Sequence, residues 1–340
     1  MGPETTSETE SALDVLVIGE SLIDVVISPS GQVEHAGGSP ANVAYGLGRL
    51  GISTGLLTAI GDDDRGTAIE AHLRSAGVTV LPGSRSLART STARVTLAAD
   101  GSADYDFDVA WDMPVTALAS LPKLLHTGSI AAFLAPGAGT VKSILERVHH
   151  HCTVTYDPNI RPALLGSHSE AVASFEDVVP ATNLVKLSDE DARWLYPLKS
   201  LQETAAYVLG LGAKLAVVTM GAGGSHLASA DATMDIPATK TTVADTIGAG
   251  DSFMSALILG YLNEDNVSPE AMRRMGEAAT AAAAITVGRA GANPPSATEL
   301  NEALRRNHPY QRRIRPRMSS SAGNPGKSEN CPVHAAPSHH

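Results

Sequence analysis

A short segment of the chain combines two glycines with a single acid, directly before an apolar stretch. Residues Ala244–Ser252 read Ala-Asp-Thr-Ile-Gly-Ala-Gly-Asp-Ser, and the apolar side chains of Phe253–Leu262 recur at helical spacing, so a tight turn that opens a helix is predicted. The first N–H groups of a helix lack intrahelical partners and can hold phosphate oxygens. Asp251 would repel a phosphate there, unless it accepts the proton of a hydroxyl that attacks the phosphate. The segment therefore indicates phosphoryl transfer; a plain glycine turn with a first-turn helix acid is the alternative.

A second glycine-rich segment, Gly37–Gly51, reads Gly-Gly-Ser-Pro-Ala-Asn-Val-Ala-Tyr-Gly-Leu-Gly-Arg-Leu-Gly. Ser39 can cap a helix and Pro40 suits its first turn, so a helix is predicted here too. The double glycine lets a ligand approach the backbone closely, and Asn42 offers both a donor and an acceptor to a hydroxyl-rich ligand. Taken alone, the segment predicts only the start of a helix.

These two segments resemble the signatures of a known family. Asp245–Asp251 matches a signature of the PfkB, or ribokinase-like, sugar kinases, and Gly37–Gly51 is similar to the second signature of that family, about 200 residues upstream and in the right order. The resemblance runs from about Asp14 to Leu304. It implies an ATP-dependent carbohydrate kinase with a three-layer α/β sandwich, a mostly parallel central sheet and a small β-stranded lid.

The resemblance also implies roles for particular residues. Asp251 would be the catalytic base, and the backbone of Gly248, Ala249 and Gly250 would hold phosphates. The acceptor sugar would be bound by Asp24, Gly38, Asn42 and Arg161; the last of these follows Asp157-Pro158-Asn159-Ile160, similar to a fructokinase-like segment. A solvated strand-end acid and a surface arginine are the alternatives for Asp24 and Arg161.

The same resemblance implies that a further set of residues binds the nucleotide: Lys186, Thr219, Gly221, Gly224 and Asn293. The family's magnesium segment corresponds to Lys186–Asp191, where Ser188 replaces an asparagine, so either Glu190 or Asp191 would order Mg²⁺. Relatives use the backbone near Asp245 for a monovalent cation such as K⁺, and Asp245 is counted with the metal residues on that ground.

The elements that must position these residues alternate between strands and helices. Short apolar runs predict buried core strands at 15–18, 54–60, 124–129, 153–156, 183–187 and 215–219, separated by helical stretches at 65–76, 140–149, 201–211 and 277–287. Period-two alternation over 88–109 around the turn Asp100-Gly101 predicts a hairpin, which with a strand over about 22–35 would form the lid. We expect a disordered segment at 1–11, a kinase domain over 12–308 and a disordered tail at 309–340.

Composition limits the other functions. The chain has 340 residues, 43% of them hydrophobic and 18% charged, which predicts a globular fold. A net charge of -11 disfavours nucleic acid as a partner. The first residues lack the basic and apolar regions of a signal peptide, and no apolar run approaches 18 residues, so a soluble protein without a membrane partner is expected. Two cysteines cannot form a disulfide framework, which favours the cytoplasm.

The charge of the expected lid bears on the acceptor. Between Gly83 and Asp112 three arginines face five aspartates, and an acceptor that already carries phosphate would need a concentrated cationic clamp. A neutral sugar is therefore predicted. Fructose is the first choice by resemblance, with ketodeoxygluconate, ribose or a nucleoside as alternatives, and a sugar- or nucleotide-sensing protein without catalysis as a different class. Relatives pair through their lids, so a homodimer is also expected.

Overall fold

The structure, a computed structural model, describes residues 13–28, 31–97, 103–113 and 120–307. The expectations for the two ends of the chain, 1–11 and 309–340, and for the turn Asp100-Gly101 lie outside these residues. None of the helices in the described ranges is both long and apolar enough to cross a membrane.

The central sheet has nine strands in the order β15-β14-β13-β12-β11-β10-β1-β4-β6. All neighbours pair in parallel except the last two strands, β14 and β15, which continue β13 as an antiparallel meander. The strands are β1 Val15–Ile18, β4 Thr54–Leu57, β6 Thr79–Val80, β10 Leu124–Gly128, β11 Thr153–Asp157, β12 Leu184–Ser188, β13 Leu215–Thr219, β14 Ser225–Ser229 and β15 Thr233–Ile236.

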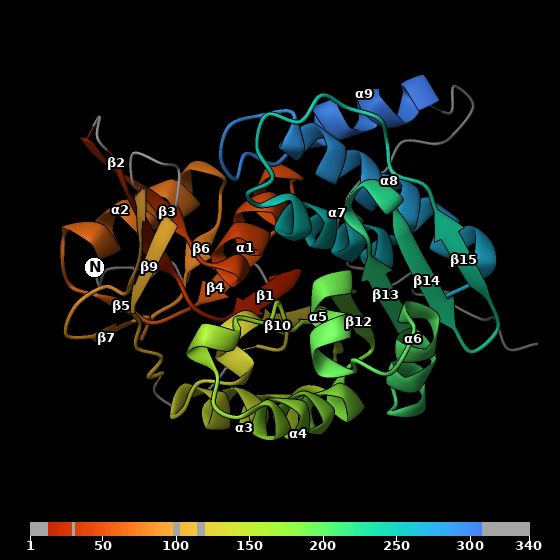
Figure 1. Cartoon of the computed structure of the whole chain (residues 1–340), viewed down its shortest axis with the longest axis horizontal. Helices are drawn as coiled ribbons and strands as arrows, with labels where there is room; N and C mark the ends of the chain where they lie inside the picture. The colour runs from red at the N-terminus through yellow and green to blue at the C-terminus, as the bar shows by residue number, and fades with distance from the viewer. Residues whose placement is uncertain (1–12, 29–30, 98–102, 114–119, 308–340) are drawn as a thin grey trace, which may run out of the picture.

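Helices cover both faces of this sheet, as Figure 1 shows. One face carries α1 Ser39–Arg49, α2 Asp64–Ser75, α7 Ala249–Asn263, α8 Pro269–Val287 and α9 Ala297–Asn307; the other carries α3 Gly137–Val148, α4 His168–Val178, α5 Asp189–Leu195 and α6 Leu201–Gly210. Successive residues of β1 alternate between the two cores: Val15 and Val17 pack under α1 and α7, and Leu16 and Ile18 pack under α3. The predicted three-layer α/β sandwich is confirmed.

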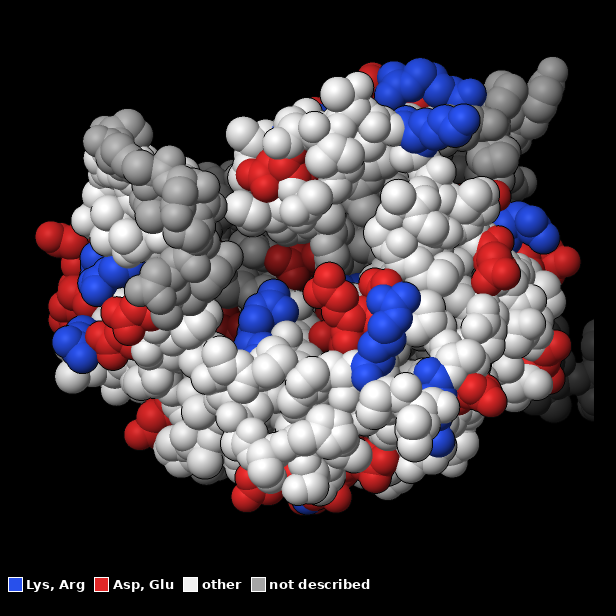
Figure 2. All heavy atoms as spheres, in the orientation of Figure 1, with Lys and Arg blue, Asp and Glu red and all other residues white. Residues whose placement is uncertain are grey.

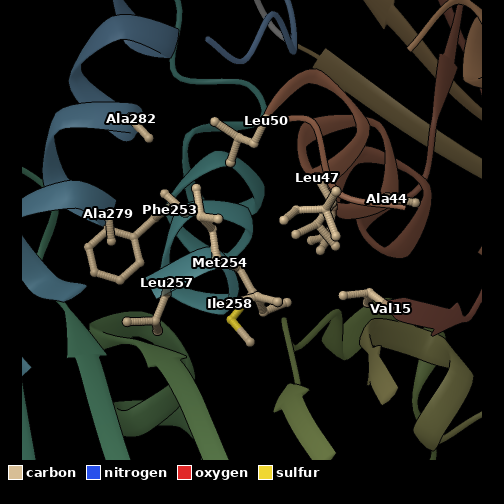
Figure 3. Close-up of a cluster of buried hydrophobic side chains, with 14 of the residues drawn as sticks. Val15, Ala44, Leu47, Leu50, Phe253, Met254, Leu257, Ile258, Ala279 and Ala282 are labelled. Carbon is tan, nitrogen blue, oxygen red and sulfur yellow. The ribbon is translucent and has the colours of Figure 1, made fainter. Parts of the chain in front are cut away.

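The helix α7 is buried on all sides. Every residue from Ser252 to Gly260 is buried, which is typical of a helix that is apolar all round. It packs between α1 and α8, and Figure 3 shows Phe253 of α7 directed at Ala279 of α8. This packing fixes the start of α7, and with it the glycine turn, at the carboxyl ends of the parallel strands.

A separate four-stranded sheet forms the lid, in the order β3-β2-β8-β9. Its strands are β2 Leu22–Ser28, β3 Gly31–Gly37, β8 Thr92–Leu97 and β9 Ala103–Asp108, so the predicted lid is confirmed with one correction. The segment over 22–35 is two antiparallel strands rather than one.

The single strand predicted over 54–60 is also interrupted. Strand β4 ends at Leu57, and a second short strand, β5 Ile60–Gly61, pairs instead with β7 Arg85–Leu87. The chain leaves the central sheet because Thr58 is held elsewhere: its N–H donates to the Ser84 hydroxyl and its own hydroxyl donates to Ser21.

We expect the substitution Leu257→Ala in α7 to lower the free energy of unfolding by about 2–5 kcal/mol, because it leaves a cavity in a fully buried position. Leu198→Ala removes the same atoms from a side chain that is 98% exposed and should change stability by less than about 0.5 kcal/mol. Urea unfolding of both variants makes the comparison. Equal effects would show that α7 does not anchor the core.

Candidate active site

A cleft of about 420 Å³ opens at the carboxyl ends of the central strands, a size suited to a small-molecule ligand. Figure 2 shows acidic and basic residues gathered around a hollow near the centre of this face. The loop after β11, strand β12, helix α5, the end of β13 with the loop after it, and the start of α7 contribute the lining residues. These are Asn159, Ile160, Arg161, Pro162, Lys186, Ser188, Asp189, Glu190, Asp191, Trp194, Thr219, Gly221, Thr246 and Gly250.

The carboxylate of Asp251 is held at the first turn of α7. Ser39 Oγ donates to Asp251 Oδ1 at 2.7 Å, and Asn42 Nδ2 donates to Asp251 Oδ2 at 2.9 Å. The turn before it requires glycine, because Gly248, the residue that precedes the helix, has φ of 74° and lies against Ala292. The two donors come from the start of α1, so both predicted signature segments meet at this acid.

The helix predicted to start within Gly37–Gly51 is confirmed as α1, Ser39–Arg49, and two of its side chains donate to Asp251. The position before α1 is occupied by Gly38, and Ser39, predicted as a cap, donates to Asp251 instead. Asn42, predicted to face the sugar, uses its amide N–H on the same carboxylate. Its carbonyl oxygen is the part of the side chain that could still accept a bond from a ligand.

The start of α7 also offers donors to an anion. The N–H of Ala249 donates to the Thr246 carbonyl at 3.3 Å. In the described part of the chain, no hydrogen bond uses the next two N–H groups, those of Gly250 and Asp251. Gly250 lines the cleft, so its amide and the helix dipole can bind a phosphate there.

The two glycines before α1, Gly37 and Gly38, are packed closely against other residues of the chain. A side-chain carbon on Gly37 would overlap the Asp24 carboxylate, and one on Gly38, whose φ is 99°, would lie 2.7 Å from the Glu20 carbonyl oxygen. The Asp24 carboxylate and the Glu20 backbone thus lie where side chains at these two positions would be. The close approach of a ligand to this backbone stays a prediction. The two acids thereby flank the start of α1, next to Asp251.

Burial and mutual repulsion perturb the acids of this region. Burial raises the pKa of Glu20 to about 7, with a smaller contribution from the negative charge of Asp251. Burial likewise raises the pKa of Asp24 to about 6 and that of Asp157 to about 6. The guanidinium of Arg161 opposes the rise at Glu20 and Asp24. Such perturbed carboxyl groups near a cleft are typical of a functional site.

Glu190 and Asp191, the two acids that the sequence offered as candidates for ordering Mg²⁺, lie in different environments. Asp191 is buried, and its two oxygens accept the N–H groups of Ile160 and Ser188, each at 2.8 Å. Glu190 is exposed at the edge of the cleft. Asp191 therefore fixes the backbone of two cleft segments, while the Glu190 side chain is open to solvent at the cleft.

Asp245 lies outside the lining of the cleft. Its carboxylate accepts the N–H of Ile247 at 3.0 Å and that of Gly291 at 2.9 Å, which lower its pKa. It therefore ties the loop before α7 to the loop after α8. In the described residues no group of three or more His, Cys, Asp or Glu side chains is arranged around a common metal position.

The residues assigned to the nucleotide divide into two groups. Lys186, Thr219 and Gly221 line the cleft. Gly224 and Asn293 do not: Gly224 forms the turn between β13 and β14 with φ of 90°, and Asn293 is exposed in the loop after α8.

Arg161 reaches the cleft from the loop after β11. Its guanidinium donates to the carbonyls of Ile160 at 3.0 Å and Asn159 at 3.3 Å, and its side chain is exposed. The backbone of Asn159 is in the left-handed region with φ of 38°, a conformation that is uncommon for residues other than glycine.

Two acids of the site, Glu20 and Asp157, were given no role from the sequence. Both come directly at or after the end of a buried strand, β1 or β11. The carboxyl ends of adjacent parallel strands meet at one edge of a sheet, and ligands bind there. An acid within two residues of the end of a predicted core strand was the signal that could have found both.

A mostly parallel α/β sandwich with a separate β lid, and an acid at an anion-binding helix start, define a kinase of small hydroxylated molecules. Comparison with protein families reaches a finer answer. The family described as pfkB family carbohydrate kinase matches residues 12–299, and the chain belongs to this family.

Relatives and a solved structure agree with this membership. A fructokinase of Rhizobium leguminosarum bv. trifolii is 34% identical over 74% of this chain and 81% of its own length. Fructokinase-1 of Oryza sativa subsp. japonica is 32% identical over 84% of this chain and 95% of its own. An uncharacterized sugar kinase from Pyrococcus horikoshii, solved in complex with ATP, is 26% identical with a TM-score of 0.70, over 85% of this chain and 100% of its own.

The chain is therefore a carbohydrate kinase, and the predicted ribokinase-like fold is confirmed.

The raised pKa of Glu20 implies that the free energy of unfolding depends on pH. The folded state, with a pKa of about 7 against 4.5 for the unfolded chain, keeps a proton that the unfolded chain loses. Stability from this group is present below pH 4.5 and is lost as the pH rises through 7. From pH 5 to pH 8 we expect the free energy of unfolding of the native protein to fall by about 2–3 kcal/mol relative to that of Glu20→Gln.

Urea unfolding at both pH values measures this difference. The matched control is Glu146→Gln, which makes the same acid-to-amide change at an exposed position of α3. A gap between native protein and Glu20→Gln that is the same at pH 5 and pH 8 would contradict the prediction.

Proposed function

We propose that the enzyme transfers the γ-phosphate of ATP to a primary hydroxyl of a neutral sugar, with fructose as the first candidate and Asp251 as the general base. The observation that carries this proposal is the Asp251 carboxylate, fixed by Ser39 and Asn42 at the start of α7, beside the cleft. The hydroxyl oxygen forms a bond to the γ-phosphorus, the bond from that phosphorus to the ADP oxygen breaks, and the hydroxyl proton goes to Asp251.

On the nucleotide side, we assign phosphate binding to the backbone of Gly248–Gly250, with the amide of Gly250 as the donor left free by the described residues, together with Lys186, and nucleotide contacts to Thr219 and Gly221 in the cleft. Gly224 and Asn293 would act further out, through the shape of their loops. Mg²⁺ suits this site, because the exposed Glu190 supplies one hard oxygen ligand and Mg²⁺ keeps several waters and phosphate oxygens. When bound, Mg²⁺ would neutralise phosphate charge. We likewise propose that K⁺ binds near Asp245.

On the acceptor side, we assign sugar binding to Asp24, Gly38, Asn42 and Arg161. The lid arginines support a neutral acceptor, because each already pairs with an acid: Arg89 with Asp108 and Arg94 with Asp106. Arg85 pairs with Asp62 and Glu70. Fructose rests on the names of the relatives, which are fructokinases. Ketodeoxygluconate, ribose and a nucleoside are the alternative acceptors.

We also propose that residues 12–308 act as one kinase domain and that two copies pair through their lids. The exposed side chain of Val33 on β3, 53% accessible, supports a contact at this sheet. Pairing would be measured as the mass of the protein in solution.

The test of the function is ADP release from ATP and Mg²⁺ across fructose, ribose, ketodeoxygluconate and a nucleoside, with Asp251→Asn beside the native protein. We expect turnover on fructose and a fall of about 10²–10⁴ in kcat for the variant, because loss of a general base costs that much. The control Asp177→Asn changes an exposed acid of α4 that pairs with Lys142, and should keep native kcat. Sugar binding without ADP from any acceptor would reject the kinase assignment and favour a sensing protein.

The two acids of the metal segment should respond differently. Glu190→Gln removes the exposed ligand, so the Mg²⁺ concentration for half-maximal activity should rise about tenfold with unchanged stability. Asp191→Asn leaves one of two buried backbone N–H groups without its acceptor, and should lower the free energy of unfolding by about 1–3 kcal/mol. Magnesium titration and urea unfolding of both variants decide; a Mg²⁺ effect confined to Asp191→Asn would contradict the assignment of Glu190.

A further inference from the structure

Asp157 and Lys186 form a buried ion pair beneath the start of α7. Lys186 Nζ lies 2.8 Å from Asp157 Oδ2, and the side chains are 5% exposed for Lys186 and 1% for Asp157. Every other ion pair in the described part of the chain leaves at least one partner exposed to solvent. A buried pair is weak evidence for stability, because desolvation offsets the attraction between the charges. Its place in the molecule therefore calls for another explanation.

The pleat of the sheet puts both side chains on the same face. Strand β11 pairs with β12 so that Tyr156 lies beside Val185, and both of these belong to the core under α3–α6. The following residues, Asp157 and Lys186, are therefore neighbours in register and point to the opposite face, where α7 lies.

Only one partner of the pair reaches the cleft. Lys186 is among the residues that line it, and its Nζ lies 3.2 Å from the position that a side-chain carbon on Gly250 would take. Asp157 is not a lining residue and contacts the cleft through Lys186 alone. The ammonium thus lies beside the first turn of α7, at the end of the cleft where the amides can bind a phosphate.

The charges support a permanent cation here. Burial disfavours the Lys186 ammonium, but the carboxylates of Asp157 and Asp191 outweigh burial and raise its pKa. Burial raises the pKa of Asp157 to about 6, and the attraction of Lys186 opposes this rise, so both groups are ionised at neutral pH. The second oxygen of Asp157 is buried and has no hydrogen-bond partner among the described residues, so Lys186 is the contact that defines the orientation of this carboxylate.

We propose that Asp157 is a positioning residue that holds the Lys186 ammonium where the transferred phosphoryl group must pass. The inference rests on the proposed function, which places the phosphates at the start of α7. A lysine side chain is long and flexible, and its ammonium has three donors. One donor is taken by Asp157, so the chain is fixed in one direction while the other donors serve the phosphate. An acid that never touches substrate thereby sets the geometry of phosphoryl transfer.

The test compares Asp157→Asn, Lys186→Met and the double variant. We expect Asp157→Asn to weaken ATP binding at least tenfold by calorimetry with Mg²⁺, to leave AMP binding within twofold, and to lower kcat about 10²-fold, the loss typical of one charge-stabilising donor. The acceptor KM should stay within twofold. The double variant should be no worse than Lys186→Met alone, because an acid that acts through the lysine has no effect without it. Asp177→Asn on α4 is the control.

Three results would overturn the proposal. The first is an unchanged ratio of ATP to AMP affinity in Asp157→Asn. The second is equal weakening of ATP and AMP together with a lower melting temperature, which is the mark of a structural role. The third is an additive loss in the double variant, whose buried charges are both removed and which tests the pair even where Asp157→Asn fails to fold. If the native protein phosphorylates no sugar, the proposed function fails, and the ATP-to-AMP comparison still decides the role of Asp157.

Discussion

The two hydrogen bonds that Ser39 and Asn42 donate to Asp251 join the starts of two helices that are more than 200 residues apart in sequence. Both helices lie on one face of a parallel sheet, so their N-terminal ends meet at the edge where the strands end. Backbone amides and the positive ends of two helix dipoles are thereby concentrated around one acid. The position of the cleft, the lid and the neighbouring acids all follow from this meeting point.

The site balances strong charges of both signs. Glu20 and Asp157 are buried, Asp24 is partly buried, and all three lie close enough to Asp251 to feel its charge; this repulsion adds to the cost of burial. The opposing positive charge comes from Arg161 beside Glu20 and Asp24, from Lys186 beside Asp157, and from the helix starts. A site of this kind is organised for an anion, because a bound polyphosphate would repel the acids unless cations and amides held it apart from them.

The lid contributes shape rather than charge. Its arginines pair with acids of the lid or of the adjoining helix α2, so their charge is neutralised locally. It also joins the body through Asp63, which caps α2 and accepts both the N–H and the hydroxyl of Thr90, just before β8. Movement of the lid would therefore be coupled to the start of α2, and closure would exclude water from the acceptor.

The sequence by itself determined the family, through the signatures in its two glycine segments, and the layered fold with most of its core strands, because apolar periodicity is a local signal. That the two glycine segments meet at Asp251 was decided by the tertiary structure. The sequence missed β14, whose five residues are all buried although three are Ser or His. Only the tertiary structure decided that Asp191 is buried and accepts two backbone N–H groups while Glu190 is exposed at the cleft, and that Ser39 bonds Asp251 rather than its own helix. These outcomes depend on which backbone N–H or carboxylate lies opposite a side chain, and partners distant in sequence leave no local pattern to read.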